Sequence, residues 1–154
     1  MIVTLQKMTR TLWRWTPAPI RILLARGTQT KFTASATAII FNEQGEVLLL
    51  DHVFRPTSGW ALPGGFFAPR EQAADALCRE IREETGLELE DVRICHARTD
   101  ETHIEIFFSA RTGGTPEVKS KEIIALRWFK PEDLPENMLQ LQRSLIQKVL
   151  DGHL

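Results

Sequence analysis

The chain has 154 residues, of which 43% are hydrophobic and 25% charged, and this composition is typical of one soluble globular domain. Its net charge of −1 indicates no bulk attraction to nucleic acid or to membrane surfaces, and no apolar run is long enough to cross a bilayer. We expect the two cysteines, Cys78 and Cys95, to be reduced thiols of a cytoplasmic protein; a disulfide between them is the alternative.

The start of the chain is basic. Residues 1–42 contain no Asp or Glu but six Lys or Arg residues, which leaves a net charge of −7 on the remainder. The apolar side chains of its first part are Leu12, Trp13, Trp15, Ile20, Ile22, Leu23 and Leu24. We expect residues 1–31 to dock on the main domain, residues 32–154, through one or two short amphipathic pieces. A targeting peptide is the alternative, but Pro17 and Pro19 interrupt any long amphipathic helix there.

The rest of the chain mixes strand and helix patterns. Runs of β-branched and apolar residues predict strands at 32–41, 47–50, 92–99, 103–111 and 123–129, the first two joined as a hairpin. Helical patterns predict helices at 70–85 and 137–150, and stretches containing Pro and Gly predict loops at 52–63 and 112–122. Strands around two main helices indicate a layered α/β domain.

The predicted helix at 70–85 carries three carboxylates on one face. Glu80, Glu83 and Glu84 stand at i, i+3 and i+4, within roughly one 100° arc of a helix. Their repulsion would weaken an isolated helix, whereas a divalent cation would turn it into binding, because Mg²⁺ takes oxygen ligands. We therefore expect Glu83 and Glu84 to be exposed metal ligands; a solvated helix face is the alternative.

The same stretch resembles the signature of the Nudix hydrolases. All nine signature positions match, namely Gly65, Glu71, Arg79, Glu80, Ile81, Glu83, Glu84, Gly86 and Leu87. The resemblance is carried by residues 65–87, and the segments on either side also look like the family. It implies an α/β/α sandwich with a central mixed β-sheet, and a metal-dependent hydrolase of a nucleoside diphosphate linked to another group.

The resemblance also implies a ligand set for the metal. Glu83 and Glu84 are the first choice, with Glu80 as a third ligand or as the general base. The carbonyl of Gly64 would add a further ligand, as in related enzymes. The expected ion is Mg²⁺, for which Mn²⁺ could substitute.

Two further roles follow from the resemblance. Arg79 would orient the carboxylates by bidentate pairing, with Glu71 as its structural partner. Enzymes of the family often recruit one more carboxylate from a distant loop, and Glu122 is the best candidate for it, ahead of Glu117. A surface role for Glu122 is the alternative.

Other side chains could contact a substrate. Phosphate or ribose could be bound by Arg55, Lys119 and Lys121, although solvated surface is the favoured interpretation of each. A base could stack on one of the aromatic residues around the glycine turn, which are Phe54, Trp60, Phe66 and Phe67. Packing of these rings in the core or the loop is the favoured alternative.

We therefore consider three hypotheses for the function. The leading one is a Mg²⁺-dependent pyrophosphohydrolase, monomeric or homodimeric, which acts on a nucleotide-type small molecule. The second is a catalytically idle Nudix-like domain that binds a nucleotide as a regulator. The third is an RNA 5′-end pyrophosphohydrolase that uses the basic segment to hold RNA. The region of residues 102–104, where subgroups of the family carry substrate marks, shows none of them, so the substrate stays open.

Overall fold

A computed structural model of the chain describes residues 10, 12–53 and 59–153. The chain forms two compact units, Met1–Lys31 and Phe32–Leu154, which are described separately below. No helix among the described residues is long and apolar enough to cross a membrane.

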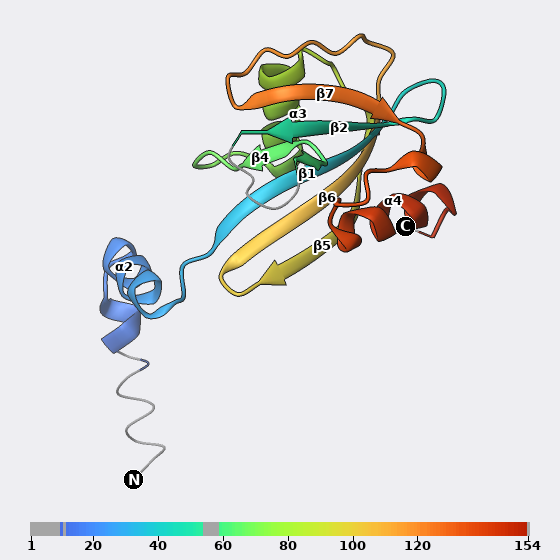
Figure 1. Ribbon diagram of the computed structural model, residues 1–154. Helices are drawn as coiled ribbons and strands as arrows, with labels where there is room; N and C mark the ends of the chain where they lie inside the picture. The colour runs from blue at the N-terminus through green and yellow to red at the C-terminus, as the bar shows by residue number, and fades with distance from the viewer. Residues whose placement is uncertain (1–9, 11, 54–58, 154) are drawn as a thin grey trace. The chain divides into compact units, whose positions relative to one another are not determined.

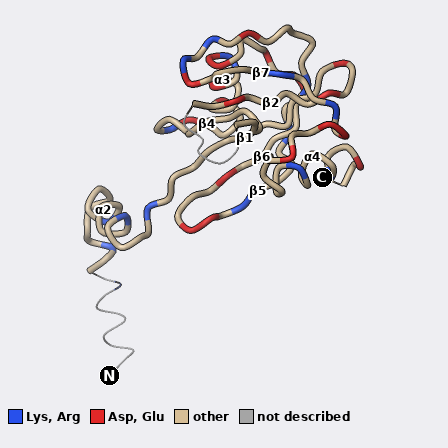
Figure 2. The backbone as a smooth tube through the Cα atoms, in the orientation of Figure 1, with Lys and Arg blue, Asp and Glu red and all other residues tan. Residues whose placement is uncertain are grey.

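The first unit contains helical segments on either side of a proline break. Residues 12–15 are helical, and helix α2 (Ala18–Thr28) begins after Pro17, whose fixed backbone angle suits the start of a helix. None of the residues of α2 is buried. The charged residues of this helix are all basic, as Figure 2 shows.

Removing residues 1–26 should lower the melting temperature of the chain. The predicted docking uses Trp13, Trp15, Ile22 and Leu23 as apolar anchors, and each large apolar side chain that becomes buried contributes about 1.5–3 kcal/mol. Thermal unfolding of the full and shortened chains, followed by circular dichroism, measures the difference. Equal melting temperatures would show that the segment does not dock on the main domain.

The second unit contains the sheet and two long helices (Figure 1). Its strands are β1 (Thr33–Phe41), β2 (Val47–His52), β3 (Trp60–Ala61), β4 (Gly64–Phe66), β5 (Glu90–Asp100), β6 (His103–Arg111) and β7 (Ile123–Phe129). Its helices are α3 (Ala73–Thr85), the short 3-10 helix η1 (Pro131–Asp133) and α4 (Gln140–Leu150).

In the part of the chain that the structure describes, the strands form one seven-stranded sheet. The order is β3-β2-β1-β6-β5, with β4 also paired to β1 and β7 to β2. The β1–β6 pair is parallel and runs in register from Thr33↔His103 to Phe41↔Arg111. The other pairs are antiparallel. The sheet is therefore mixed, as the resemblance to the Nudix hydrolases implied.

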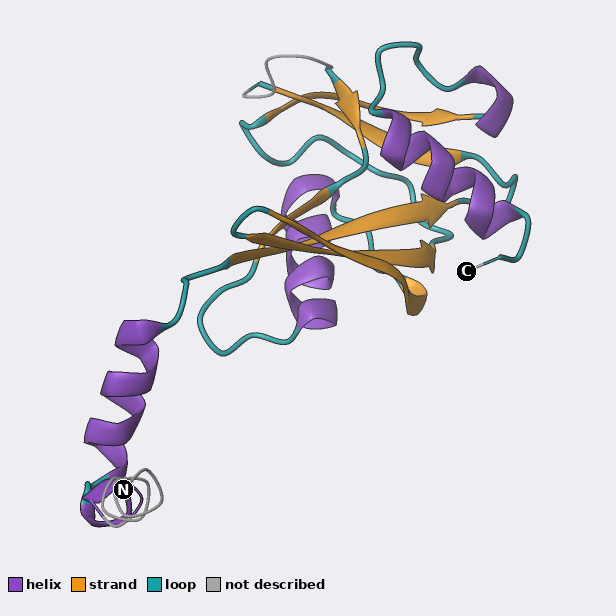
Figure 3. Cartoon of the chain, turned by 90° about the horizontal axis from the view of Figure 1, so that it is seen from below, coloured by secondary structure: helices purple, strands orange, loops and turns teal. Residues whose placement is uncertain are grey.

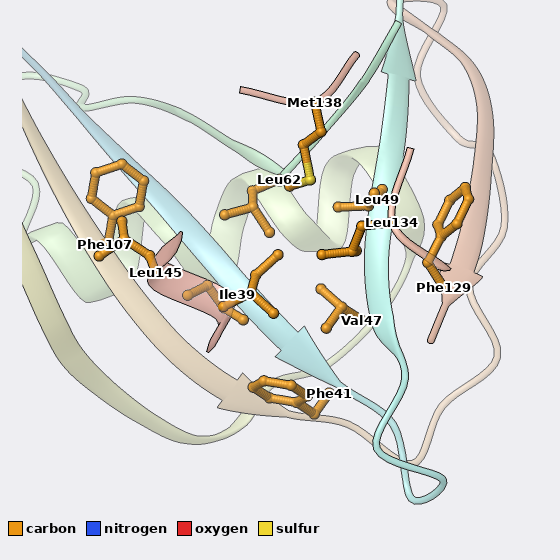
Figure 4. Packing of buried hydrophobic residues seen from close by; sticks show 11 residues of the cluster. Ile39, Phe41, Val47, Leu49, Leu62, Phe107, Phe129, Leu134, Met138 and Leu145 are labelled. Carbon is orange, nitrogen blue, oxygen red and sulfur yellow. The ribbon is translucent and has the colours of Figure 1, made fainter. Parts of the chain in front are cut away.

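Each face of this sheet is covered by one helix, because successive strand residues point to opposite sides. On the α4 side, the core includes Ile39, Val47, Leu49, Leu145 and Ile146, and Figure 4 shows Leu62 and Met138 completing this layer. On the α3 side, the core includes Ala38, Ile40, Leu48, Leu77 and Ile81. Figures 1 and 3 show the two helices against opposite sides of the sheet, which confirms the predicted α/β/α sandwich.

Some boundaries differ from the sequence predictions. The expected loop at 52–63 contains β3, a strand that depends on long-range pairing with β2. Helix α3 begins at Ala73 instead of residue 70, because Arg70 has a φ of 70°, in the left-handed region that a right-handed helix excludes. Helix α4 begins at Gln140, three residues later than expected. Cys78 and Cys95 are free thiols, as predicted.

Candidate active site

Helix α3 is positioned by its packing on the core and ends at a glycine. Its apolar side chains Leu77 and Ile81 are fully buried under the sheet. Gly86 ends the helix in the left-handed conformation with a φ of 73°, and its N–H donates to the carbonyl of Arg82 at 2.9 Å. The C-terminal half of α3, which carries the acidic residues, is thereby held in one orientation.

The three signature carboxylates differ in their exposure. The side chain of Glu83 is 61% exposed, and that of Glu80 is 21% exposed. Glu84 is buried, with only 7% of the residue exposed, so the expectation that it is exposed was wrong. The reason is geometric: Glu84 stands three residues after the buried Ile81, and such positions share a helix face.

Arg79 holds the signature side chains together. Its Nε and Nη2 donate to the two carboxylate oxygens of Glu71, at 2.8 and 3.0 Å, so the predicted bidentate pair is present. Its Nη1 donates to Glu80 at 2.8 Å and to Glu83 at 3.5 Å, and Nη2 also donates to the carbonyl of Phe66 at 3.2 Å. These bonds raise the pKa of Arg79, chiefly through Glu71 and then Glu80. The arginine thus ties the β4–α3 connection to the acidic face of the helix.

Glu71 should make the stability of the domain depend on pH in the acid range. Hydrogen bonds from Arg79, and then from the backbone N–H of Ala68, lower the pKa of its carboxyl from 4.5 to about 2. A pKa lowered by folding stabilises the protein fully above the unfolded value of 4.5, and the contribution is lost as pH falls toward 2. We expect Glu71→Gln to lower the melting temperature at pH 7 and to have little effect near pH 2.

Melting temperatures between pH 2 and pH 7 measure this difference. Glu132→Gln, at an exposed position of η1, serves as the control and should leave the profile unchanged. A Glu71→Gln effect of the same size at every pH would contradict the assignment.

The turn at Gly64 and Gly65 places its backbone in contact with the acidic face of α3. In the β1–β4 pair, Gly64 lies opposite Thr37 and Gly65 opposite Ala36. A Cβ at Gly64 would collide with the carbonyl of Ala36, and a Cβ at Gly65 would collide with the carboxylate of Glu80. At Gly64 only glycine allows this approach of backbone to backbone, and at Gly65 a larger residue would displace the Glu80 side chain. The structure therefore brings β4 and Glu80 together, as the predicted ligand set requires.

The donor chemistry of this face fits a hard divalent cation, because it offers carboxylate and backbone oxygens and no sulfur or imidazole. Among the described residues, however, no group of three or more His, Cys, Asp or Glu side chains is arranged to hold a metal ion. Arg79 engages both Glu80 and Glu83. These two side chains would have to turn away from Arg79 to join Glu84 as ligands.

The loop that precedes β7 runs along the C-terminal end of α3. The backbone N–H of Glu117 donates to the carbonyl of Thr85 and that of Lys119 to the carbonyl of Glu84, both at 2.9 Å. The ammonium of Lys119 lies against Gly86, where a cation stabilises the end of the helix. Glu122 is exposed and lies further along, and its carbonyl accepts from the N–H of Val53 at 2.9 Å.

The aromatic residues around the glycine turn have different environments. Trp60 packs edge-on against Phe129, with ring centroids 5.1 Å apart, and Phe67 packs against the core on the α3 side. Phe66 is 64% exposed and makes an edge contact of 5.7 Å with His103. Packing is thus confirmed for two of the rings. Phe54 and Arg55 lie outside the described residues.

A cavity of about 610 Å³ opens on the α4 side of the sheet beside Gly64 and Gly65. Its polar lining consists of Ser35, Thr37, Arg98, Asp100, His103 and Glu105, together with Gln140 and Gln142. Its apolar lining consists of Phe66, Phe107, Leu139 and Leu141. Small-molecule sites have volumes of about 300–1,000 Å³ and are lined by apolar side chains together with some polar groups. A larger cavity of about 920 Å³, near Asn42 and Leu150, contains none of the predicted site residues.

None of the polar residues that line the smaller cavity was predicted from the sequence to belong to the site, and His103, Arg98 and Glu105 are among them. The ring nitrogens of His103 lie 2.7 Å from the Thr33 hydroxyl and 2.9 Å from the Ser35 hydroxyl. Nε of Arg98 donates to Glu105 at 2.9 Å. One signal in the sequence could have revealed two of them: a strand has a period of two, which places His103 and Glu105 on the same face of the strand at 103–111.

The NUDIX domain family matches residues 31–149 of the chain. The chain belongs to the Nudix family. The matched region includes the α3 signature, the glycine turn and the strands that line the cavity.

Individual Nudix relatives agree with this assignment. A Bacillus subtilis (strain 168) protein, whose provisional name is 8-oxo-dGTP diphosphatase, is 31% identical over 79% of this chain and 82% of its own length. Human 8-oxo-dGDP phosphatase NUDT18 is also 31% identical, over 77% of this chain but only 37% of its own length. The crystal structure of a MutT NUDIX hydrolase from Burkholderia pseudomallei has a TM-score of 0.67 and 30% identity, covering 78% of this chain and 99% of that one. The chain is thus a Nudix hydrolase that acts on phosphorus-containing acid anhydrides.

Proposed function

We propose that this Nudix chain is a Mg²⁺-dependent pyrophosphohydrolase that cleaves a phosphoanhydride bond of a nucleoside diphosphate derivative or a nucleoside triphosphate. The observation that carries the proposal is the position of Glu80. Its carboxylate lies directly against the backbone of Gly65, and Gly65 also lines the cavity of about 610 Å³. The acidic face of α3 and a cavity large enough for a nucleoside therefore meet at the same turn.

Glu83 and Glu84 would hold the ion, together with Glu80 and the carbonyl of Gly64. A bound Mg²⁺ would neutralise phosphate charge, align the anhydride and lower the pKa of water. Arg79 would hold Glu80 and Glu83 near one another until the ion binds, since its Nη1 donates to both. Its bond to Glu71 would keep the guanidinium in place when those carboxylates turn away.

Glu122 would take the proton from the attacking water. A carboxylate that ligates a metal is a poor proton acceptor, so the base is best supplied by a residue outside the ligand set. Glu122 is exposed and follows the loop whose 117–119 segment bonds to the last turn of α3. Loops on a rigid scaffold often carry such groups.

The names of the relatives give the first substrates to test. Two of them are named for 8-oxo-dGTP and 8-oxo-dGDP, so these nucleotides, with their unoxidised forms, head a panel of nucleoside triphosphates, nucleotide sugars and dinucleotides. We expect turnover of at least one of these substrates in the presence of Mg²⁺, with a nucleoside monophosphate among the products. No turnover across the panel with either Mg²⁺ or Mn²⁺ would contradict the proposal.

The same panel separates the two other functions. Tight nucleotide binding without hydrolysis would identify an idle regulator. A strong preference for RNA 5′ ends, lost steeply as the salt concentration rises, would identify an RNA pyrophosphohydrolase that uses the basic first segment. Salt-insensitive hydrolysis of small nucleotides would exclude that role for the segment.

A further inference from the structure

The polar wall of the cavity is built from one row of residues across three strands. Ser35 of β1 lies opposite Glu105 of β6, and Glu105 lies opposite Arg98 of β5. Directly opposed residues of neighbouring strands project from the same face of a sheet. This face is the α4 side, because Phe107, two residues after Glu105, belongs to the core layer under α4.

Glu105 is an acceptor of this wall whose two carboxylate oxygens are both held by hydrogen bonds. Its side chain is only 14% exposed. Oε1 accepts from the hydroxyl of Thr37 at 3.0 Å, and Oε2 accepts from Nε of Arg98 at 2.9 Å. An ionised carboxylate offers about four acceptor sites, so these two bonds orient the group and leave capacity for donors from a ligand in the cavity.

Arg98 places hydrogen-bond donors next to that acceptor. Nη1 lies 3.7 Å from Asp100, and Nε is used by Glu105. Arginine carries five N–H donors in a planar fork. Arg98 and Glu105 both line the cavity, so an Arg98 N–H that Glu105 does not use and the two Glu105 oxygens would offer a ligand one donor followed by two acceptors.

We infer that Glu105, oriented by Arg98 and Thr37, makes this site selective for a guanine-type base. The Watson–Crick edge of guanine presents one carbonyl acceptor and then two donors, N1–H and the 2-amino group, which is the complement of the Arg98–Glu105 pair. Adenine and cytosine would direct a ring nitrogen lone pair at the carboxylate, and uracil offers a single donor between two carbonyls. Oxidation at C8 leaves the guanine edge unchanged, so Glu105 should accept guanine and 8-oxoguanine alike.

The inference rests on the proposed function, and substrates that differ by single groups test it. We expect the full-length wild-type enzyme to have a kcat/KM for GTP about 10- to 100-fold above that for ITP, whose base lacks only the 2-amino group. Glu105→Gln should remove most of this preference by lowering the GTP value. The same substitution should leave the ITP value within about threefold, because ITP uses fewer of the acceptors.

Glu101→Gln is the matched control. It makes the same chemical change in the exposed turn between β5 and β6 and should keep the wild-type preference. Equal kcat/KM values of the wild-type enzyme for GTP and ITP, or an equal loss on both substrates in Glu105→Gln, would show that Glu105 is only a cross-strand ion pair. If Glu105→Gln does not fold, equal kcat/KM values of the wild-type enzyme for GTP and ITP would still overturn the inference.

Binding of GMP and IMP to the metal-free full chain separates this inference from the proposed function. Isothermal titration should show GMP bound about 10- to 100-fold more tightly than IMP, with the difference lost in Glu105→Gln. If GMP binds more tightly than IMP but the chain hydrolyses no substrate, the base selectivity is supported and the proposed hydrolase function is overturned. If the chain hydrolyses nucleotides but does not discriminate between guanine and hypoxanthine, the hydrolase function is supported and the base selectivity is overturned.

Discussion

Glu84→Gln should lower Mg²⁺-supported turnover by about 10²-fold or more while the domain stays folded. Glutamine keeps the shape of the side chain and removes the charge that a divalent ion needs. Glu84 is held at a buried position by the helix, and its backbone carbonyl accepts from Lys119 at 2.9 Å. Its carboxylate therefore has less freedom than that of Glu83, so we expect Glu83→Gln to have a similar or smaller effect.

The matched control for this substitution is Glu88→Gln, three residues beyond the end of α3. Glu88 is 69% exposed and pairs with Arg82 instead of facing the glycine turn. Its substitution should leave turnover within about twofold of the wild-type value. Normal rates in both Glu83→Gln and Glu84→Gln, with melting temperatures unchanged, would remove the acidic face of α3 from the mechanism.

Glu122→Gln should lower kcat by about 10²–10⁴-fold with little change in KM, which is the usual effect of losing a general base. Glutamine cannot accept the proton of the attacking water, and Glu122 is not in the proposed ligand set, so metal binding should be retained. The measurement is steady-state kinetics with Mg²⁺ at saturating and limiting substrate.

Glu117→Gln is the comparison that makes this result specific. Its backbone is tied to α3 through Thr85, and its substitution should have a much smaller effect. Full activity of Glu122→Gln, together with an inactive Glu80→Gln that still binds metal, would assign the base to Glu80. A larger loss in Glu117→Gln than in Glu122→Gln would move the role to the segment that contacts the helix.

Local patterns predicted the long elements of the fold well. The strands at 103–111 and 123–129 have the predicted bounds, because segments of seven to nine residues rich in β-branched and apolar side chains are a strong indication of a strand. Strands β3 and β4 have two and three residues and depend on partners in β2 and β1, so no local pattern reveals them. The start of α3 was misplaced because the left-handed backbone of Arg70 depends on its surroundings.

The candidate site was predictable in part for a similar reason. The signature and its spacing indicated Glu71 as the partner of Arg79, and this pair is present. The burial of Glu84 depends on how the helix is rotated against the sheet, which the signature alone does not fix. The cavity wall requires β1, β6 and β5 to lie side by side, and the adjacency of strands distant in sequence cannot be read from any one of them.

The metal-site assignment is tested most directly by following one nucleoside triphosphate by ³¹P nuclear magnetic resonance while Mg²⁺ is titrated into the metal-free full chain. We expect no turnover without the ion, and conversion to a nucleoside monophosphate and pyrophosphate as Mg²⁺ is added. The Glu83→Gln, Glu84→Gln double variant should require far more Mg²⁺ or remain inactive. Equal turnover with and without the ion, or an unchanged Mg²⁺ requirement in the double variant, would contradict the claim that the acidic face of α3 is a metal site for phosphoanhydride hydrolysis.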